Sequence, residues 1–402
     1  MHTLPSDQNA SGRSFGSNEI DNLRKVIESG TLFAPKGRFV KDLESRFSQW
    51  MNGSASVACS SGTAAIHAAI AGIDPEPGDE IITTPITDMG AIAPILYQGA
   101  IPVFADVNPD TGNVSAQSVS ERLSDRTKAV IVTHLFGNPA DVEAIAHSAK
   151  QHGVALIEDC AQAFGATLSD RRVGEYGAVA TFSLQQGKHI TTGEGGLIAV
   201  HDESLYRRIR LFINKAWDYD GPSDHEFLAL NYRMSELEGA VGLAQLSKLT
   251  HSVSLRIAMA RRLDEGLSDV PGVRPIPVLD VATNSYWRYG LIVEDGQVPG
   301  GPDQLAAKLR EFGLPSGPRY VKKPAFQTAL FRDQRTFGES RWPFTLARPE
   351  AVDYSESRFP GTFDFLRRVL VLPWNERLEK SHVSAMAEAI RTSVLSLREE
   401  AA

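Results

Sequence analysis

Short apolar runs rich in β-branched residues alternate with longer segments of helical periodicity between about residues 55 and 200. This alternation predicts strands at 56–59, 80–83, 101–105, 129–133, 155–158, 178–183 and 196–200, with helices at 62–72, 89–98 and 141–152. Strands that alternate with helices are typical of βαβ units, whose parallel strands are buried on both faces. The pattern therefore predicts an α/β fold built on a mostly parallel sheet.

The second half of the chain is more mixed. Helical periodicity continues at 203–213, 235–249 and 252–267, then strands are expected at 286–294 and 369–372, and helices at 303–312 and 381–397. Ser235 with Glu238 three residues later is a capping-box signature for the start of its helix. We expect a large domain over residues 1–250 and a smaller C-terminal α/β domain over residues 251–402.

Composition narrows the class of ligand. The 402 residues carry a formal charge of −8 with 42% hydrophobic residues, which excludes a disordered chain and, without a basic tract, argues against a nucleic-acid partner. No apolar run reaches the roughly 18 residues of a membrane span, and residues 1–10 do not resemble a signal peptide. Two cysteines, Cys59 and Cys160, cannot build a disulfide framework. A cytoplasmic protein that binds small molecules is the expectation.

Two segments at predicted strand ends carry candidate chemistry. Ser61, Gly62 and Thr63 lie between a strand and a helix, where free N–H groups and the helix dipole can hold an anion. They could equally form an ordinary helix cap. Asp159 ends the strand 155–158, at the sheet edge where α/β proteins bind ligands, although it too could be a cap.

Lys188 lies in a small-residue turn after the strand that ends at Ser183. A solvated surface lysine is the ordinary alternative, but in a closed polar pocket its amine becomes a nucleophile. Asn231 precedes the helix of Ser235 and could also hold an anion there.

Taken together, these residues match the needs of pyridoxal 5′-phosphate. That cofactor requires an amine for its aldehyde, a carboxylate for its ring nitrogen and a cradle for its phosphate. Lys188, Asp159 and the turn at residues 61–63 supply these three groups. Nothing in the sequence points to a metal site.

Six motifs in order resemble the DegT/DnrJ/EryC1/StrS sugar aminotransferases, from about residue 15 to the C-terminus. They are Ser-Gly-Thr-Ala-Ala at 61–65, Pro-Gly-Asp-Glu at 77–80, Gly-Ala-Ile-Pro-Val-Phe-Ala-Asp at 99–106, Glu-Asp-Cys-Ala-Gln-Ala at 158–163, Gly-Lys-His-Ile-Thr-Thr-Gly-Glu-Gly-Gly at 187–196 and Asn-Tyr-Arg-Met-Ser-Glu at 231–236. The resemblance implies the fold type I architecture, a three-layer large domain with a smaller C-terminal domain.

The same resemblance implies a role for each candidate residue. Lys188 forms the internal aldimine and shuttles the proton, and Asp159 pairs with the pyridine nitrogen, whose charge should lower the pKa of the carboxyl. Gln162 lies against the ring or its phenolic oxygen. Gly62, Thr63 and Ser183 hold the phosphate together with the Ser61 turn. Asn231 reaches the cofactor phosphate of the neighbouring subunit, which implies a homodimer with shared active sites.

One position departs from the family. Most members have an aromatic residue that stacks on the cofactor after the Thr of Pro-x-x-Thr, whereas Thr87 is followed here by Asp88 and Met89. Asp88 could contact the amine or the substrate, or it could cap the helix expected from Met89. The segments 286–289 and 320–337, rich in aromatic and basic residues, could border the substrate or simply pack.

The resemblance implies ping-pong transfer of an amino group from glutamate or glutamine to a nucleotide-linked keto-sugar or a keto-cyclitol. Lys188 favours transamination, because some relatives with His at this position are dehydratases. A sugar dehydratase or eliminase on the same cofactor, and a non-catalytic member that binds cofactor or sugar and regulates a partner, remain alternatives.

Overall fold

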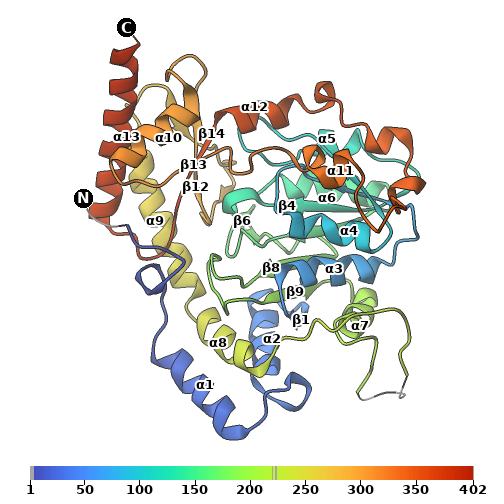
Figure 1. Cartoon of the computed structure of the whole chain (residues 1–402). Helices are drawn as coiled ribbons and strands as arrows, with labels where there is room; N and C mark the ends of the chain where they lie inside the picture. Colours follow the sequence, from blue (N-terminus) through green and yellow to red (C-terminus); the bar gives the residue numbers. More distant parts are fainter. Residues whose placement is uncertain (1–3, 220, 222–223, 402) are drawn as a thin grey trace.

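The computed structural model describes residues 4–219, 221 and 224–401 (Figure 1). Its helices are α1 (Ser17–Ser29), α2 (Phe39–Trp50), α3 (Gly62–Ile73), α4 (Ala93–Tyr97), α5 (Ala116–Ser120), α6 (Val142–Gln151), α7 (Glu203–Phe212), α8 (Glu236–Leu246), α9 (Leu249–Leu267), α10 (Gly301–Glu311), α11 (Ala329–Arg332), α12 (Pro360–Arg368) and α13 (Lys380–Glu400). Its strands are β1 (Ala55–Cys59), β2 (Glu80–Thr83), β3 (Ile101–Phe104), β4 (Thr127–Thr133), β5 (Ala155–Asp159), β6 (Thr167–Leu168), β7 (Arg171–Arg172), β8 (Val179–Ser183), β9 (Gly196–Val200), β10 (Val273–Pro275), β11 (Ala282–Thr283), β12 (Tyr289–Val293), β13 (Gly317–Pro318) and β14 (Val369–Leu372).

A seven-stranded sheet in the order β1-β9-β8-β5-β4-β2-β3 forms the centre of the molecule. The strands β2, β3, β4, β5 and β8 are parallel, and β9 pairs antiparallel with both of its neighbours. Side chains alternate between the two faces: Ile157 joins the cluster under α3 and α7, whereas Leu156 joins the cluster around α6. The predicted mostly parallel sheet between helical layers is confirmed, with all seven strands in place.

The helix expected at 89–98 is broken in the structure. A 3₁₀ turn spans Met89–Ala91, and α4 starts only at Ala93. Pro94 explains the break, because proline lacks an N–H and is tolerated in the first turn of a helix but not inside it.

A four-stranded antiparallel sheet, β10-β12-β14-β13, is the core of the C-terminal part. Apolar residues of α9, α10 and α13 cover it. Residues 325–359 instead pack phenylalanines against Ile92 and Leu96 of the α4 segment and against Phe104 of the edge strand β3. The division of the chain at residue 250 therefore stays a prediction, since part of the second half belongs to the packing of the first. None of the helices in the described part of the chain combines the length and apolar character that crossing a bilayer requires.

The carboxylate of Glu158 anchors the end of β5. It accepts hydrogen bonds from the N–H groups of Gly174 (2.6 Å), Tyr176 (2.7 Å) and Gly177 (2.7 Å), and its Oε2 lies 3.3 Å from Nε2 of His134. Burial alone would raise the pKa of Glu158, but His134 and these N–H groups outweigh it and hold the pKa below its usual value. The side chain thus fixes the strand end on which Asp159 stands.

We expect Glu158→Gln to destabilise the fold by about 3 kcal/mol at neutral pH, because an amide NH₂ then faces buried N–H donors. The contribution of Glu158 is complete above the unfolded pKa of about 4.3 and is lost as pH falls through the lower folded pKa. Urea unfolding at pH 7 and at descending pH measures both effects, with exposed Glu143→Gln as the matched control. Equal unfolding midpoints for the two variants would contradict this role.

Candidate functional site

The predicted residues follow the carboxyl ends of neighbouring strands. Ser61–Thr63 follow β1, Asp88 follows β2, Asp159 ends β5 and Ser183 ends β8. Because β1, β2, β5 and β8 run in the same direction, these ends lie at one edge of the sheet. Lys188 lies at this edge in the turn that joins β8 to β9.

Hydrogen bonds to three successive carbonyl oxygens hold the turn that carries Lys188 in place. The guanidinium of Arg13 donates from Nη1 to the Lys188 carbonyl at 2.6 Å and from Nη2 to the Gln186 carbonyl. Between them, Trp287 Nε1 donates to the Gly187 carbonyl at 2.8 Å. Arg13 is only 2% exposed, so this clamp lies inside the protein. The backbone of Lys188 is therefore held from two distant parts of the chain.

The amine of Lys188 lies over the ring of Trp287, with Nζ 4.2 Å from the ring centroid. Burial lowers the pKa of this amine to about 8, although Asp159 and Asp88 act in the opposite direction; Arg288 lowers it further. A sizeable fraction of the amine is neutral at physiological pH, which is the form that attacks an aldehyde.

Asp159 is buried and held in one orientation. Its Oδ2 accepts from Thr133 Oγ1 at 3.1 Å and its Oδ1 from the Ala161 N–H at 3.1 Å. With the protein's own groups alone, burial raises the pKa of this carboxyl, and Ala161, Lys188 and Thr133 offset the effect only in part. The lowered pKa was expected beside the charged pyridine nitrogen and stays a prediction. A further positive charge would stabilise this carboxylate, which fits a pyridinium nitrogen.

Gln162 is fixed at both ends of its amide. Oε1 accepts from the Phe136 N–H at 2.8 Å, and Nε2 donates to Tyr320 Oη at 3.2 Å. The ring of Tyr320 meets those of Phe136 and Trp287 edge to face, at 4.9 and 6.1 Å between centroids. Tyr320 and Trp287, both in segments expected to border the substrate, thus lie with Lys188 in one group.

The start of α3 faces Ser183. A Cβ atom on Gly62 would come within 2.8 Å of the Ser183 Cβ, so only glycine allows this approach. Ser61 caps the helix by accepting from the Ala64 N–H at 3.0 Å. Within the described residues, the N–H groups of Gly62 and Thr63 make no hydrogen bond, and they fit an anion at the helix dipole.

Asp88 both caps a 3₁₀ turn and lies near the Lys188 amine. Its Oδ1 accepts from the Gly90 N–H at 2.8 Å, which caps the 3₁₀ turn Met89–Ala91. The same carboxylate is exposed and raises the pKa of the Lys188 amine, so it stands near that amine. The capping role does not remove Asp88 from the site.

Asn231 lies in a loop that bonds to β1 just before the Ser61–Thr63 turn. Its loop bonds to the outer side of β1, where Ser60 N–H donates to the Tyr232 carbonyl at 2.8 Å and Arg233 pairs with Cys59. Asn231 is exposed, and among the described residues no hydrogen bond joins it to Lys188, Asp159 or Gln162. The role expected for Asn231 toward a cofactor phosphate therefore stays a prediction.

The residues present fit pyridoxal phosphate. The chain supplies a partly neutral amine, a buried carboxylate that lacks sufficient positive charge, and a glycine cradle at a helix start. Sequence reasoning missed Arg13, Thr133 and Phe136. Arg13 and Phe136 act on residues far away in the sequence or through backbone groups, for which no local motif exists.

A buried group beside the site, His134, Glu158 and Cys160, places three potential metal ligands within 4.8 Å of one another. Its donors are already used. Glu158 is saturated by the N–H groups described above, and His134 Nδ1 accepts from the Ala140 N–H at 3.1 Å. Burial raises the pKa of the Cys160 thiol well above its usual value, which keeps it protonated. We assign this group a structural role.

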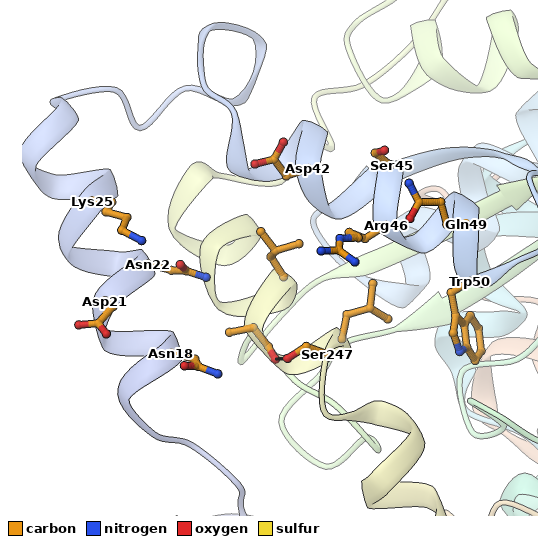
Figure 2. Close-up of a pocket in the computed structure, with 13 residues that line it drawn as sticks. Asn18, Asp21, Asn22, Lys25, Asp42, Ser45, Arg46, Gln49, Trp50 and Ser247 are labelled. Atoms are coloured by element: carbon orange, nitrogen blue, oxygen red, sulfur yellow. Dashed lines mark hydrogen bonds between the residues drawn. The ribbon is translucent and has the colours of Figure 1, made fainter.

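A groove of about 860 Å³ lies elsewhere, between α1, α2 and α8 (Figure 2). Figure 2 shows a mostly polar lining that includes Asn22, Asp42, Arg46 and Gln49, with Trp50 at one end. None of the predicted site residues lines it.

Comparison with known proteins agrees with this geometry. The profile of the DegT/DnrJ/EryC1/StrS aminotransferase family matches residues 13–391. The chain is 35% identical to L-glutamine:2-deoxy-scyllo-inosose aminotransferase of Streptomyces kanamyceticus over 320 residues. This matched region covers 75% of this chain and 74% of that protein. It is 31% identical over 319 residues to GDP-perosamine synthase of Caulobacter vibrioides, which covers 79% of this chain and 85% of that protein.

The fold is also similar to that of solved aminotransferases. The aminotransferase TlmJ from Streptoalloteichus hindustanus superposes with a TM-score of 0.83 at 28% identity, over 96% of this chain and 98% of that chain.

We expect the Lys188 amine to titrate near pH 8 and Asp159→Asn to move this midpoint to lower pH, because the variant removes a neighbouring negative charge. Titration of ¹³C-methylated lysines by NMR in cofactor-free protein measures it, with Lys188→Arg assigning the signal. A midpoint at the ordinary value of 10.5 would show that the amine is not desolvated.

Proposed function

Because the chain belongs to the DegT/DnrJ/EryC1/StrS aminotransferase family, we propose that it transfers an amino group from glutamate or glutamine to a nucleotide-linked keto-sugar or a keto-cyclitol. The two acceptor classes are those of the relatives named above, the GDP-perosamine synthase and the 2-deoxy-scyllo-inosose aminotransferase. The observation that carries the proposal is the arrangement of the Lys188 amine, the Asp159 carboxylate and the Gly62–Ser183 cradle at one sheet edge.

Pyridoxal phosphate, when bound, supplies the electron sink through which an amino group leaves one carbon and joins another. Lys188 would hold its aldehyde. The Nζ of Lys188, whose pKa in the cofactor-free protein is about 8, would accept a proton from the donor carbon and return one. The Arg13 and Trp287 bonds to the turn keep this amine in position for both half-reactions.

The other residues hold and orient. Asp159 would keep the ring nitrogen protonated, because its buried carboxylate is stabilised by a positive partner. Gln162, fixed by Phe136 and Tyr320, would lie against the ring or its phenolic oxygen. Ser61, Gly62, Thr63 and Ser183 would hold the phosphate. Asp88, at the position of the usual stacking residue, faces the amine or the substrate.

Lys188→Ala should abolish both turnover and the absorption band of the lysine-bound cofactor near the visible, because no other amine takes its place. Spectra of the purified protein with added glutamate or glutamine measure the first half-reaction, and product analysis with candidate ketones measures the second. An amine product separates transamination from elimination, and a spectral response to the donor separates both from a non-catalytic binder. Retention of band and turnover in Lys188→Ala would refute the assignment.

We propose further that the protein is a homodimer in which Asn231 reaches the cofactor phosphate of the neighbouring subunit. Exposed apolar side chains near Asn231 in the sequence support this, because Leu228 is 94% and Leu230 44% exposed. The exposed ring of Phe33 lies 5.3 Å from the guanidinium carbon of Arg233 and 5.9 Å from the ring of Tyr219. A second copy of the chain would cover this surface. Two unpaired cysteines, Cys59 and Cys160, support a cytoplasmic location.

Mixing two inactive variants tests the shared site. In a mixed dimer of Lys188→Ala and Asn231→Ala, one site would combine an intact Lys188 with the intact Asn231 of the other subunit. Equal mixing should therefore restore about a quarter of wild-type activity if subunits exchange at random. Each variant alone is the control, and sedimentation gives the mass of the assembly. A dimer in which mixing restores nothing would place Asn231 in its own subunit's site or in none.

A further inference from the structure

The N-terminal segment, residues 5–13, forms a wall of the Lys188 site and carries a carboxylate into it. Asn375 Nδ2 donates to the Pro5 carbonyl at 2.7 Å, and Gln186 Nε2 and Arg13 Nε donate to the Asp7 carbonyl at 2.9 and 2.8 Å. These bonds fix the backbone of Asp7 beside the turn of Lys188.

The side chain of Asp7 pairs with Arg288 inside this wall. Arg288 Nη1 donates to Asp7 Oδ2 at 2.6 Å, and the two side chains are 19% and 9% exposed. The guanidinium carbon of Arg288 lies 4.8 Å from the centroid of the Trp287 ring, and Lys188 Nζ lies 4.2 Å from the same centroid. The guanidinium of Arg288 and the amine of Lys188 therefore both contact the indole ring of Trp287.

The pairing leaves part of the guanidinium fork free. Within the described residues, Nε and Nη2 of Arg288 make no hydrogen bond, while Asp7 Oδ1 accepts from Gln8 Nε2 at 2.8 Å. Burial would raise the pKa of Asp7, but Arg288, Gln8 and Arg13 outweigh it and hold the pKa below its usual value, so the group is a carboxylate at neutral pH. An arginine fork binds a carboxylate best through two parallel bonds, which Asp7 does not use here.

We propose that Arg288 binds the α-carboxylate of the amino donor, and that Asp7 occupies Arg288 until the donor displaces it. The inference rests on the proposed function, because it requires an amino acid to react at Lys188. An α-amino acid carries its amine and carboxylate on one carbon, which matches a reactive amine and a guanidinium against one ring. A keto-cyclitol has no carboxylate, and a nucleotide-linked sugar carries its charge on the diphosphate.

The test uses the holoenzyme and measures each half-reaction by stopped-flow absorbance. Arg288→Lys, which keeps the charge but loses the fork, should raise the donor concentration for half-maximal rate by about tenfold or more. Asp7→Asn should lower that concentration by about threefold or more, because a competing charge is removed. The half-reaction with the ketone should keep its concentration dependence in both. Asp269→Asn, which breaks the exposed pair with Arg391, is the matched control and should change neither.

Calorimetry with glutarate, a dicarboxylate without an amine, provides a readout separate from turnover. It should bind more tightly to Asp7→Asn and more weakly to Arg288→Lys than to the wild type. Unchanged or weaker binding to Asp7→Asn, with an unchanged melting temperature, would overturn the exchange. Equal impairment of both half-reactions by Arg288→Lys would overturn the assignment of Arg288 to the donor. Failure of the proposed function is distinguishable, because the wild type itself would then give no spectral response to a donor.

Discussion

The immobilised turn of Lys188 is the constraint on which the rest of the site depends. A buried amine loses the solvation that favours its charged form, and it is useful only if its backbone cannot relax toward solvent. Arg13 and Trp287 prevent such relaxation by holding the carbonyls of residues 186, 187 and 188. Neighbouring charges then shift the pKa of the amine in opposite directions. Asp159 and Asp88 stabilise the ammonium form, whereas Arg288 stabilises the neutral amine. Reactivity is tuned by geometry that the fold supplies before any ligand binds.

Adjacent acids at the end of β5 show how one strand divides two tasks. Glu158 and Asp159 point to opposite faces of the strand. Glu158 gives its oxygens to the backbone of residues 174–177 and to His134, and it is satisfied within the protein. Asp159 receives two hydrogen bonds, and burial still raises its pKa. Glu158 therefore stabilises the edge of the sheet, whereas the carboxylate of Asp159 would be stabilised by a positively charged ligand group.

The sequence predicts the central sheet well because its signals are local. Apolar alternation, strand-end acids and the capping box at Ser235 all lie within a few residues of the structure they specify, and the structure has each of them. Only some of the residues around Lys188 can be predicted from the sequence. Asp159, Gln162 and Ser183 stand in ordered motifs, whereas Arg13 acts on a turn about 175 residues away. An arginine is ordinarily exposed, so nothing near Arg13 distinguishes it from a surface residue. The expected helix at 89–98 overlooks Pro94, whose missing N–H limits it to the first turn of α4.

The clamp formed by the N-terminal segment has a consequence for the order in which the molecule is made. Residues 5–13 leave the ribosome before all of their partners, which are residues 186–188, Arg288 and Asn375, and Arg13 also lies 3.9 Å from Glu376. The segment can thus complete all of its contacts only after residue 376 has been synthesised. Until residue 287 has emerged, the turn of Lys188 lacks the indole that holds the Gly187 carbonyl, even if Arg13 already binds the carbonyls on either side. The turn that carries the reactive lysine is therefore complete only when three separate parts of the sequence have come together.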